Sequence, residues 1–320
     1  MKSGRFIAGA LSLCVMGTNF IGMNAGAADI VAEGQCGDNA SWTLDSEGNF
    51  IVSGSGEMWE WRCRYLYMSE SDIDISWIEG QKCPWFDMRD QIKSVTISEG
   101  ITYLGEYAFL DCDNLTTISL PKSLINCGSG ATFNHCDNLT GVVLPDSLET
   151  LNGCFEYCPK ITSIDIPETV THIADDAFDM CAGLKVVIVR TKECYLPDTD
   201  SVFSNGWDET TLKRYFNGVV YGWKGSDMDA YCQKAGLDFV PFSLGDVNLD
   251  ASVNALDASV VLTAYADAAI GKASGFGSVE NYCADTDADG NIYALDASYI
   301  LSYYSYTATG GEDTFEEYMK

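Results

Sequence analysis

An internal repeat of about 23 residues constrains the fold of this chain more than any other feature of its sequence. Five six-residue segments carry apolar side chains at their first, fourth and sixth positions; they are residues 92–97, 115–120, 139–144, 161–166 and 184–189. Three of them are followed by a proline, Pro121, Pro145 or Pro167. Because proline cannot donate to a strand ladder, it marks the end of a strand. The pattern therefore predicts one short strand per repeat.

Phenylalanines and cysteines recur with the same period. The phenylalanines are Phe109, Phe133, Phe155 and Phe178, and the cysteines Cys112, Cys136, Cys158 and Cys181 follow with identical spacing. One strand and one return segment cannot bury an apolar face alone, so neighbouring repeats must stack into a solenoid of parallel strands. An exported chain rich in cysteine would first suggest disulfides. The one-per-repeat spacing instead favours a column of buried free thiols, while pairing of Cys36, Cys63, Cys83 and Cys194 stays open.

These repeats resemble the BspA-like class of leucine-rich repeats. The resemblance implies a parallel β repeat solenoid with its C-terminal closing unit over residues 92–241. Residues 34–37, 42–44, 54–58 and 84–86 resemble the N-terminal β cap of that class, expected within residues 28–91. Residues 219–226, a helical segment through Tyr231, and residues 239–240 resemble its closing unit. Such repeats serve adhesion, ligand binding and scaffolding, so the fold alone names no ligand. The strand positions expected to face a ligand are Thr117, Ser119, Val143, Ser163 and Asp165.

Residues 1–27 have the pattern of a signal peptide. Lys2 and Arg5 precede an apolar run over residues 6–16, and small residues at 25–27 fit a cleavage site. No stretch reaches the roughly 18 apolar residues of a spanning helix. The net charge of −29 disfavours nucleic acid and anionic membrane surfaces as partners. We therefore expect a secreted, extracellular protein without a membrane span.

Two acidic loops follow the repeats, at residues 246–257 and 285–296. Each places oxygen ligands at positions 1, 3, 5 and 12 and a backbone carbonyl at position 7, which is the EF-hand arrangement for calcium. The predicted ligands are Asp246, Asn248, Asp250, Ser252 and Asp257 in the first loop and Asp285, Asp287, Asp289, Asn291 and Asp296 in the second. Two such loops predict two calcium ions.

The C-terminal region resembles a type I dockerin. It has Asp at position 12, no clear helix entering either loop, and the sequence Ala-Leu-Asp-Ala-Ser at both 255–259 and 294–298. The resemblance implies a small all-α module over residues 245–306 that binds a cohesin of a cellulosome scaffoldin. We expect residues 307–320 to form a flexible acidic tail.

In that family the cohesin contacts occupy two loop and two helix positions. Carried over, they are Ala255, Leu256, Leu262 and Thr263 in the first half and Ala294, Leu295, Leu301 and Ser302 in the second. The apolar pairs depart from the hydroxyl pair of some clostridial dockerins and favour a ruminococcal type of assembly. Identical pairs in both halves would permit two docking orientations. The alternative is that Leu256 and Leu295 belong to the core of a helix pair.

The two loops differ in a way that predicts unequal affinity. The first offers three carboxylates and has Ala251 at the turn position, whereas the second offers four and has Gly290 there. A non-glycine residue at positive φ costs on the order of 1 kcal/mol. We expect the first loop to bind calcium more weakly.

No catalytic motif is recognisable in the sequence. His135 and His172 are expected to be structural, and no serine elbow, zinc-type histidine pair or phosphate loop is present. An interaction protein is the favoured interpretation, with the solenoid binding a polysaccharide, a cell surface or another protein. The alternative is a hydrolase acting on polysaccharide through an acid pair, on the solenoid or on an irregular insertion at residues 191–215.

Overall fold

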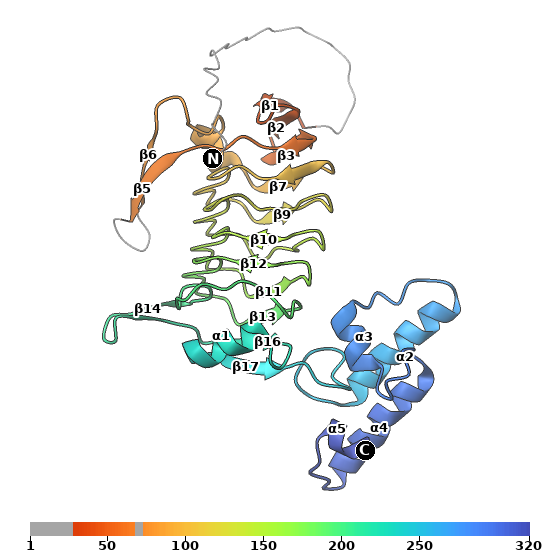
Figure 1. Ribbon diagram of the computed structural model, residues 1–320. Coiled ribbons are helices and arrows are strands. Elements are labelled where there is room, and N and C mark those ends of the chain that lie inside the picture. Colours follow the sequence, from red (N-terminus) through yellow and green to blue (C-terminus); the bar gives the residue numbers. More distant parts are fainter. Residues whose placement is uncertain (1–27, 68–72) are drawn as a thin grey trace.

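The computed structural model describes residues 28–67 and 73–320. Strands stacked along one axis form most of the chain, and a group of helices follows at the C-terminal end (Figure 1). The signal peptide predicted for residues 1–27 lies outside the described residues. None of the described helices is long and apolar enough to cross a membrane.

Antiparallel strands open the described chain. They are β1 (Ile30–Gln35), β2 (Ala40–Asp45) and β3 (Asn49–Gly54). β3 then pairs in parallel with β7 (Ser94–Ile97), so this sheet continues directly into the repeats. Phe50 contacts Trp42, Trp85 and Phe109 at ring distances of 5.3, 4.9 and 5.4 Å. These contacts cover the apolar end that the first repeat would otherwise expose.

Two ladders of short parallel strands run through the repeats and their closing unit, residues 92–241, which we call the repeat stack, and the second ladder begins in the N-terminal cap. The first contains β7 and β9 (Thr117–Ser119), then β11 (Ser163–Ile166), β13 (Val186–Val189), β16 (Val219–Gly222) and β17 (Asp238–Pro241). The second contains β4 (Gly56–Glu57) paired with β8 (Ile101–Tyr103), and β10 (Thr150–Leu151) paired with β12 (His172–Ile173), with bridges at Asn126 and Tyr195. A leucine-rich-repeat type of fold accounts for this arrangement.

The strand predicted at residues 139–144 is wrong. The first ladder ends at β9 and resumes at β11, and the segment between them has no strand assignment in that ladder. Gly141 stands in this segment, and glycine weakens a strand because it adds backbone entropy and no side-chain packing. Leu139 and Leu144 at the two ends of the segment are buried, whereas Val143 between them is 84% exposed and adds no packing that would hold a strand there.

The predicted columns of side chains are buried. The four phenylalanines are fully buried and stacked, with ring centroids 5.1 to 5.5 Å apart. The thiols of Cys136, Cys158 and Cys181 donate to the carbonyl oxygens of Phe109, Phe133 and Phe155 at 3.3, 3.2 and 3.1 Å. Each thiol therefore bonds to the preceding repeat. All twelve cysteines in the described part of the chain are free.

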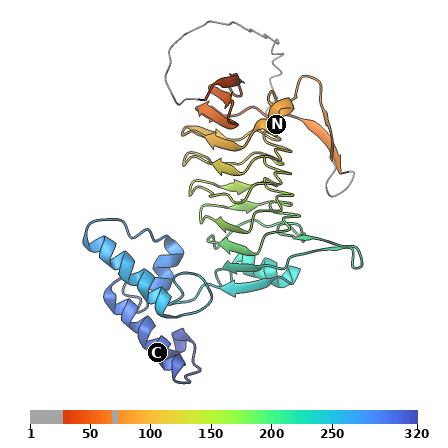
Figure 2. The same ribbon diagram turned by 180° about the vertical axis from the view of Figure 1, so that it is seen from behind.

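The segment 191–215 continues the repeats and is not an irregular insertion. Phe203 extends the phenylalanine column, 6.0 Å from Phe178. Asn205, two residues later, donates its amide N–H groups to the carbonyls of Cys181 and Leu184 in the preceding repeat. The part that departs from the repeat is a hairpin of β14 (Gly206–Asp208) and β15 (Lys213–Tyr215). It projects from the same side of the stack as the hairpin of β5 (Cys63–Tyr67) and β6 (Ile73–Trp77) (Figures 1 and 2).

Helix α1 (Asp227–Ala235) and strand β17 end the stack, and a second apolar core lies among the helices beyond it. These are α2 (Ala255–Ala269), α3 (Ser278–Ala284), α4 (Ala294–Ala308) and α5 (Phe315–Tyr318). Two expectations are wrong here. A helix, α3, does enter the second loop. The C-terminal residues are also no flexible tail, because Phe315 is 2% exposed and contacts Tyr303 at 5.1 Å.

Candidate metal centre and docking surface

The first acidic loop is folded by its own carboxylates. The side chain of Asp246 accepts the N–H groups of Asp250 and Ala251 at 3.0 and 2.9 Å. Asp257, in the first turn of α2, accepts the N–H groups of Val247 at 2.9 Å and of Asn254 at 2.9 Å. Positions 1 and 12 thus face the interior of one loop, and position 12 also caps the helix that follows.

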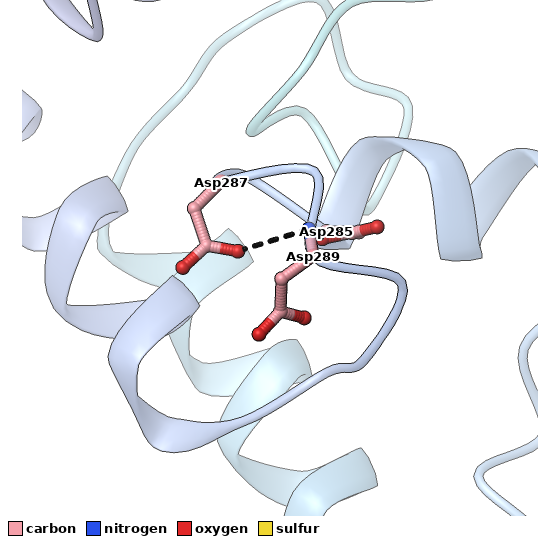
Figure 3. Close-up of side chains that lie close together, drawn as sticks. All are labelled: Asp285, Asp287 and Asp289. Atoms are coloured by element: carbon pink, nitrogen blue, oxygen red, sulfur yellow. Dashed lines mark hydrogen bonds between the residues drawn. The ribbon is translucent and has the colours of Figure 1, made fainter.

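The second loop repeats this geometry. Asp285 accepts the N–H groups of Asp289 and Gly290 at 3.0 and 2.9 Å, and Asp296 accepts those of Thr286 and Tyr293 at 2.9 and 2.8 Å. Carboxylate oxygens of Asp285, Asp287 and Asp289 lie within 4.8 Å of one another. Figure 3 shows these three side chains gathered on the loop, with the hydrogen bond between Asp287 and Asp289. Three oxygens at this separation suit a single hard cation.

Several of the loop carboxylates are buried without a basic partner. Asp246, Asp257 and Asp296 are 4, 0 and 1% exposed, and no lysine or arginine of the described residues forms an ion pair with them. Burial raises the pKa of Asp246 to about 6 and also raises the pKa of Asp257. Buried carboxylates are stable when paired or bound to a metal. An all-oxygen donor set of this kind fits calcium, with the residues predicted from the sequence.

The backbones of the two loops differ at position 6. Ala251 has φ 64° and Gly290 has φ 83°. At position 4 both loops have a non-glycine residue with positive φ, Leu249 at 57° and Ala288 at 59°. Position 6 is therefore where the first loop carries additional backbone strain relative to the second.

The residues carried over as cohesin contacts lie on the exposed sides of α2 and α4. All eight are exposed: Ala255, Leu256, Leu262, Thr263, Ala294, Leu295, Leu301 and Ser302. Leu256 and Leu295 are 63 and 51% exposed, so the alternative that they form the core of the helix pair is wrong. The core contacts of the two helices come instead from their opposite sides, where Val261 and Ile300 are fully buried.

Two aromatic residues also lie on the exposed sides of these helices; the sequence reasoning missed Tyr265 and assigned Tyr304 to helix packing. Tyr265 and Tyr304 are 39 and 45% exposed and occupy the same position in the two halves. Tyr304 follows Tyr265 by the same number of residues as the second loop follows the first. This duplication could have predicted that the two tyrosines are equivalent. Tyr265 also contacts Tyr293 at 6.4 Å, across the two helices.

The two histidines lie in the repeat stack, away from the acidic loops. His135 is 6% exposed, its ring stacks on Tyr157 at 4.5 Å, and burial lowers its pKa to about 4. His172 lies on β12 with its ring 5.5 Å from Tyr195. The stacking of both rings suits the structural role expected for them.

Comparisons with solved structures find bacterial leucine-rich-repeat proteins. A leucine-rich repeat protein from Eubacterium ventriosum is 18% identical, with 54% of this chain and 41% of that chain covered and a TM-score of 0.36. The leucine-rich repeat protein of T. pallidum is 19% identical, covering 49% of this chain and 72% of that one, with a TM-score of 0.31. The pneumococcal vaccine antigen PcpA is 19% identical, covering 47% of this chain and 36% of that one, with a TM-score of 0.35. This chain thus spans less than half the length of the first and third. No curated protein matches the chain.

Two protein families match separate parts of the chain. Six copies of the BspA type leucine rich repeat region match residues 84–205, and the dockerin type I domain matches residues 244–304. Both are interaction modules without catalytic residues of their own, and type I dockerins bind calcium and cohesins. The chain therefore combines a BspA-type leucine-rich-repeat region with a C-terminal type I dockerin domain.

Proposed function

We propose that the chain is a secreted, non-catalytic component of a cellulosome-type assembly. Its dockerin, over residues 245–306 with two calcium ions, binds a scaffoldin cohesin of the ruminococcal type. Its repeat solenoid, residues 92–241 behind a β cap at 28–91, presents a surface to a second partner. Residues 1–27 serve as the signal peptide. The observation that carries the proposal is the pair of exposed leucines, Leu256 and Leu295, held at equivalent places beside two equivalent acidic loops.

Calcium would act here through the folding of the loops. When bound, it neutralises the clustered carboxylates of each loop. Asp257 and Asp296 tie each loop to the start of its helix through hydrogen bonds to backbone N–H groups of the loop. Leu256 and Leu295 directly precede these two aspartates. Calcium removal should therefore disorder the cohesin surface together with the loops.

The test is calorimetric titration of the full chain against a panel of cohesins, with calcium and with chelator. We expect tight binding in calcium and none in chelator. Leu256→Asp and Leu295→Asp should each retain binding, because the other half still docks, whereas the double variant should lose it. Leu212→Asp, on the β14–β15 hairpin, is the matched control, because Leu212 is 68% exposed and lies outside the dockerin. Absence of binding to every cohesin would overturn the proposal.

The second partner is proposed to contact the strand face of the solenoid. Thr117, Ser119, Val143, Ser163 and Asp165 are all exposed there. Polysaccharide, cell-surface protein or another protein would each meet a shallow surface of this kind. A glycan array and a pull-down with the full chain distinguish these classes, and the variant Val143→Asp tests whether this face is used.

A further inference from the structure

The end of the repeat stack packs against the dockerin. These contacts go beyond the short covalent link between the two parts. Phe242, in that link, is 7% exposed and donates its N–H to the carbonyl of Gly222 at 2.8 Å. Ile188, Tyr221 and Trp223 of the stack pack against the apolar core of the dockerin. In both ribbon views the helices lie beside the end of the stack formed by β16 and β17 (Figures 1 and 2).

An arginine links the two parts through two carboxylates. Arg190 follows β13 and forms a two-pronged contact with Asp165 of β11, with both distances 2.7 Å. Its other N–H groups reach Glu280 of α3, at 2.8 and 2.7 Å. Arg190 and Glu280 are 18 and 19% exposed in their side chains, so this pair is largely shielded from water. The planar guanidinium of an arginine held by two carboxylates fixes the orientation of the groups that it joins, in addition to pairing their charges.

Aromatic contacts surround this ion pair. Trp223 donates its indole N–H to the carbonyl of Arg190 at 2.8 Å. Its ring meets Tyr282 of α3 edge to face at 4.9 Å and Phe242 at 5.3 Å. Lys192 lies over the same indole, 4.3 Å from the ring centroid. The dockerin therefore contributes α3 to the contact, through Glu280 and Tyr282.

The cohesin surface is left uncovered by this contact. Leu256 and Leu262 of α2, and Leu295 and Leu301 of α4, are 42 to 63% exposed with the dockerin in place against the stack. Both halves of the dockerin thus stay available while α3 is engaged.

We infer that the stack and the dockerin form one rigid body, so that the solenoid projects from a scaffold in two fixed directions, one for each docking orientation. A flexible link would instead give a continuous range of directions. The rigid contact is independent of cohesin binding, whereas the two directions rest on the proposed function.

Small-angle X-ray scattering of the free, calcium-loaded chain tests the rigid contact. The wild-type profile should fit one arrangement, and Glu280→Lys, which places a cation against Arg190, should increase the maximum dimension and require several arrangements. Trp223→Ala should act in the same way from the other side. Glu312→Lys, an equal charge change on an exposed residue, should leave the profile unchanged, and calcium calorimetry on each variant verifies that the dockerin is folded. A wild-type profile that requires many arrangements, or a profile unaffected by both Glu280→Lys and Trp223→Ala, overturns the inference.

Scattering of the cohesin complexes tests the two directions. Leu256→Asp and Leu295→Asp should each lock one orientation and give two different single-arrangement profiles, with the wild type between them. Identical profiles from the two locked complexes would refute the two directions. That result leaves the proposed cohesin binding intact, since calorimetry measures it separately.

Discussion

Exchanging the residues at position 6 of the two loops should shift calcium affinity in opposite directions. Ala251 has φ 64°, a conformation that costs an L-residue roughly 1–2 kcal/mol. Glycine removes that cost but loses more backbone entropy on ordering, roughly 0.5–1 kcal/mol. The net gain for Ala251→Gly is about 0.5–1 kcal/mol, which corresponds to about two- to fivefold tighter binding at the first loop. Gly290→Ala should weaken the second loop by a similar factor.

This gain should appear as calcium affinity because the loop depends on the ion for its order. Asp246 and Asp257 are buried with no basic partner among the described residues; burial raises the pKa of both, and the nearby carboxylates of Asp257 and Asp250 raise that of Asp246 further. We expect calcium to offset the cost of ionising these carboxylates and to stabilise the loop in the observed conformation, so relief of the strain at Ala251 adds to calcium affinity.

Calorimetry on the full chain measures Ala251→Gly in an Asp285→Ala background, which leaves the first loop as the binding site, and Gly290→Ala in an Asp246→Ala background, which leaves the second. Ala273→Gly is the control, since Ala273 is exposed and has no positive φ. Unchanged affinity in Ala251→Gly together with unchanged affinity in Gly290→Ala would refute the reasoning. A wild-type chain with equal sites, or with the tighter site in the first loop, would do so as well.

Three further outcomes follow from the packing. Phe133→Ala removes a fully buried ring that is stacked on both sides. The free energy of unfolding of the repeat stack, measured in urea, should fall by about 3–5 kcal/mol. A loss under about 1 kcal/mol would contradict the stacked phenylalanine column. Burial raises the pKa of the Cys136 and Cys158 thiols, so neither should react with a disulfide reagent in the native state at pH 8. Peptide mass spectrometry measures the extent of labelling, and rapid labelling would contradict their burial. Phe315→Ala should lower the thermal midpoint of the calcium-loaded dockerin and speed hydrogen exchange in α5, whereas an unchanged midpoint would favour a loose tail after all.

The periodic parts of the fold were predictable because repetition reveals burial. Phenylalanine and cysteine columns are visible in the sequence since each repeat places the same residue type at the same buried position. The phenylalanine column continues at Phe203, but no cysteine follows three residues later, so the paired signal is lost, although the amide of Asn205 still bonds to the preceding repeat.

Local backbone conformation was harder to predict than burial. Each repeat contains residues with positive φ at a fixed spacing, Asp111, His135, Tyr157 and Met180, and none of these is glycine. Their side chains carry no common signal of that conformation. Interruption of the strand ladder at Gly141 was missed for a related reason, since the apolar pattern of residues 139–144 matches that of its neighbours.

The loops and the docking surface were predictable from their duplication, but the contact between the dockerin and the repeat stack was not. The constant offset between the two halves of the dockerin identifies ligands, exposed leucines and, in hindsight, Tyr265 and Tyr304. The contact of Arg190 with Glu280 joins residues 90 positions apart that share no pattern. Such a contact depends on how two folded parts meet, which no local pattern encodes.

The gap in the first strand ladder leaves two separate sheets along the stack, which differ in how they would respond to force. β11, β13, β16 and β17 form a single sheet that joins the dockerin, whereas β1, β2, β3, β7 and β9 form another. A load transmitted from a scaffold reaches the first of these sheets directly. At segment 139–144 the first ladder makes no strand pairing, and the two halves are joined by the second ladder through the Asn126–Thr150 bridge and by the stacked rings of Phe133 and Phe155. Because one ladder spans this level where two span its neighbours, extension should begin there. The stack would then extend in its middle, while the contact between the dockerin and the C-terminal sheet stays intact.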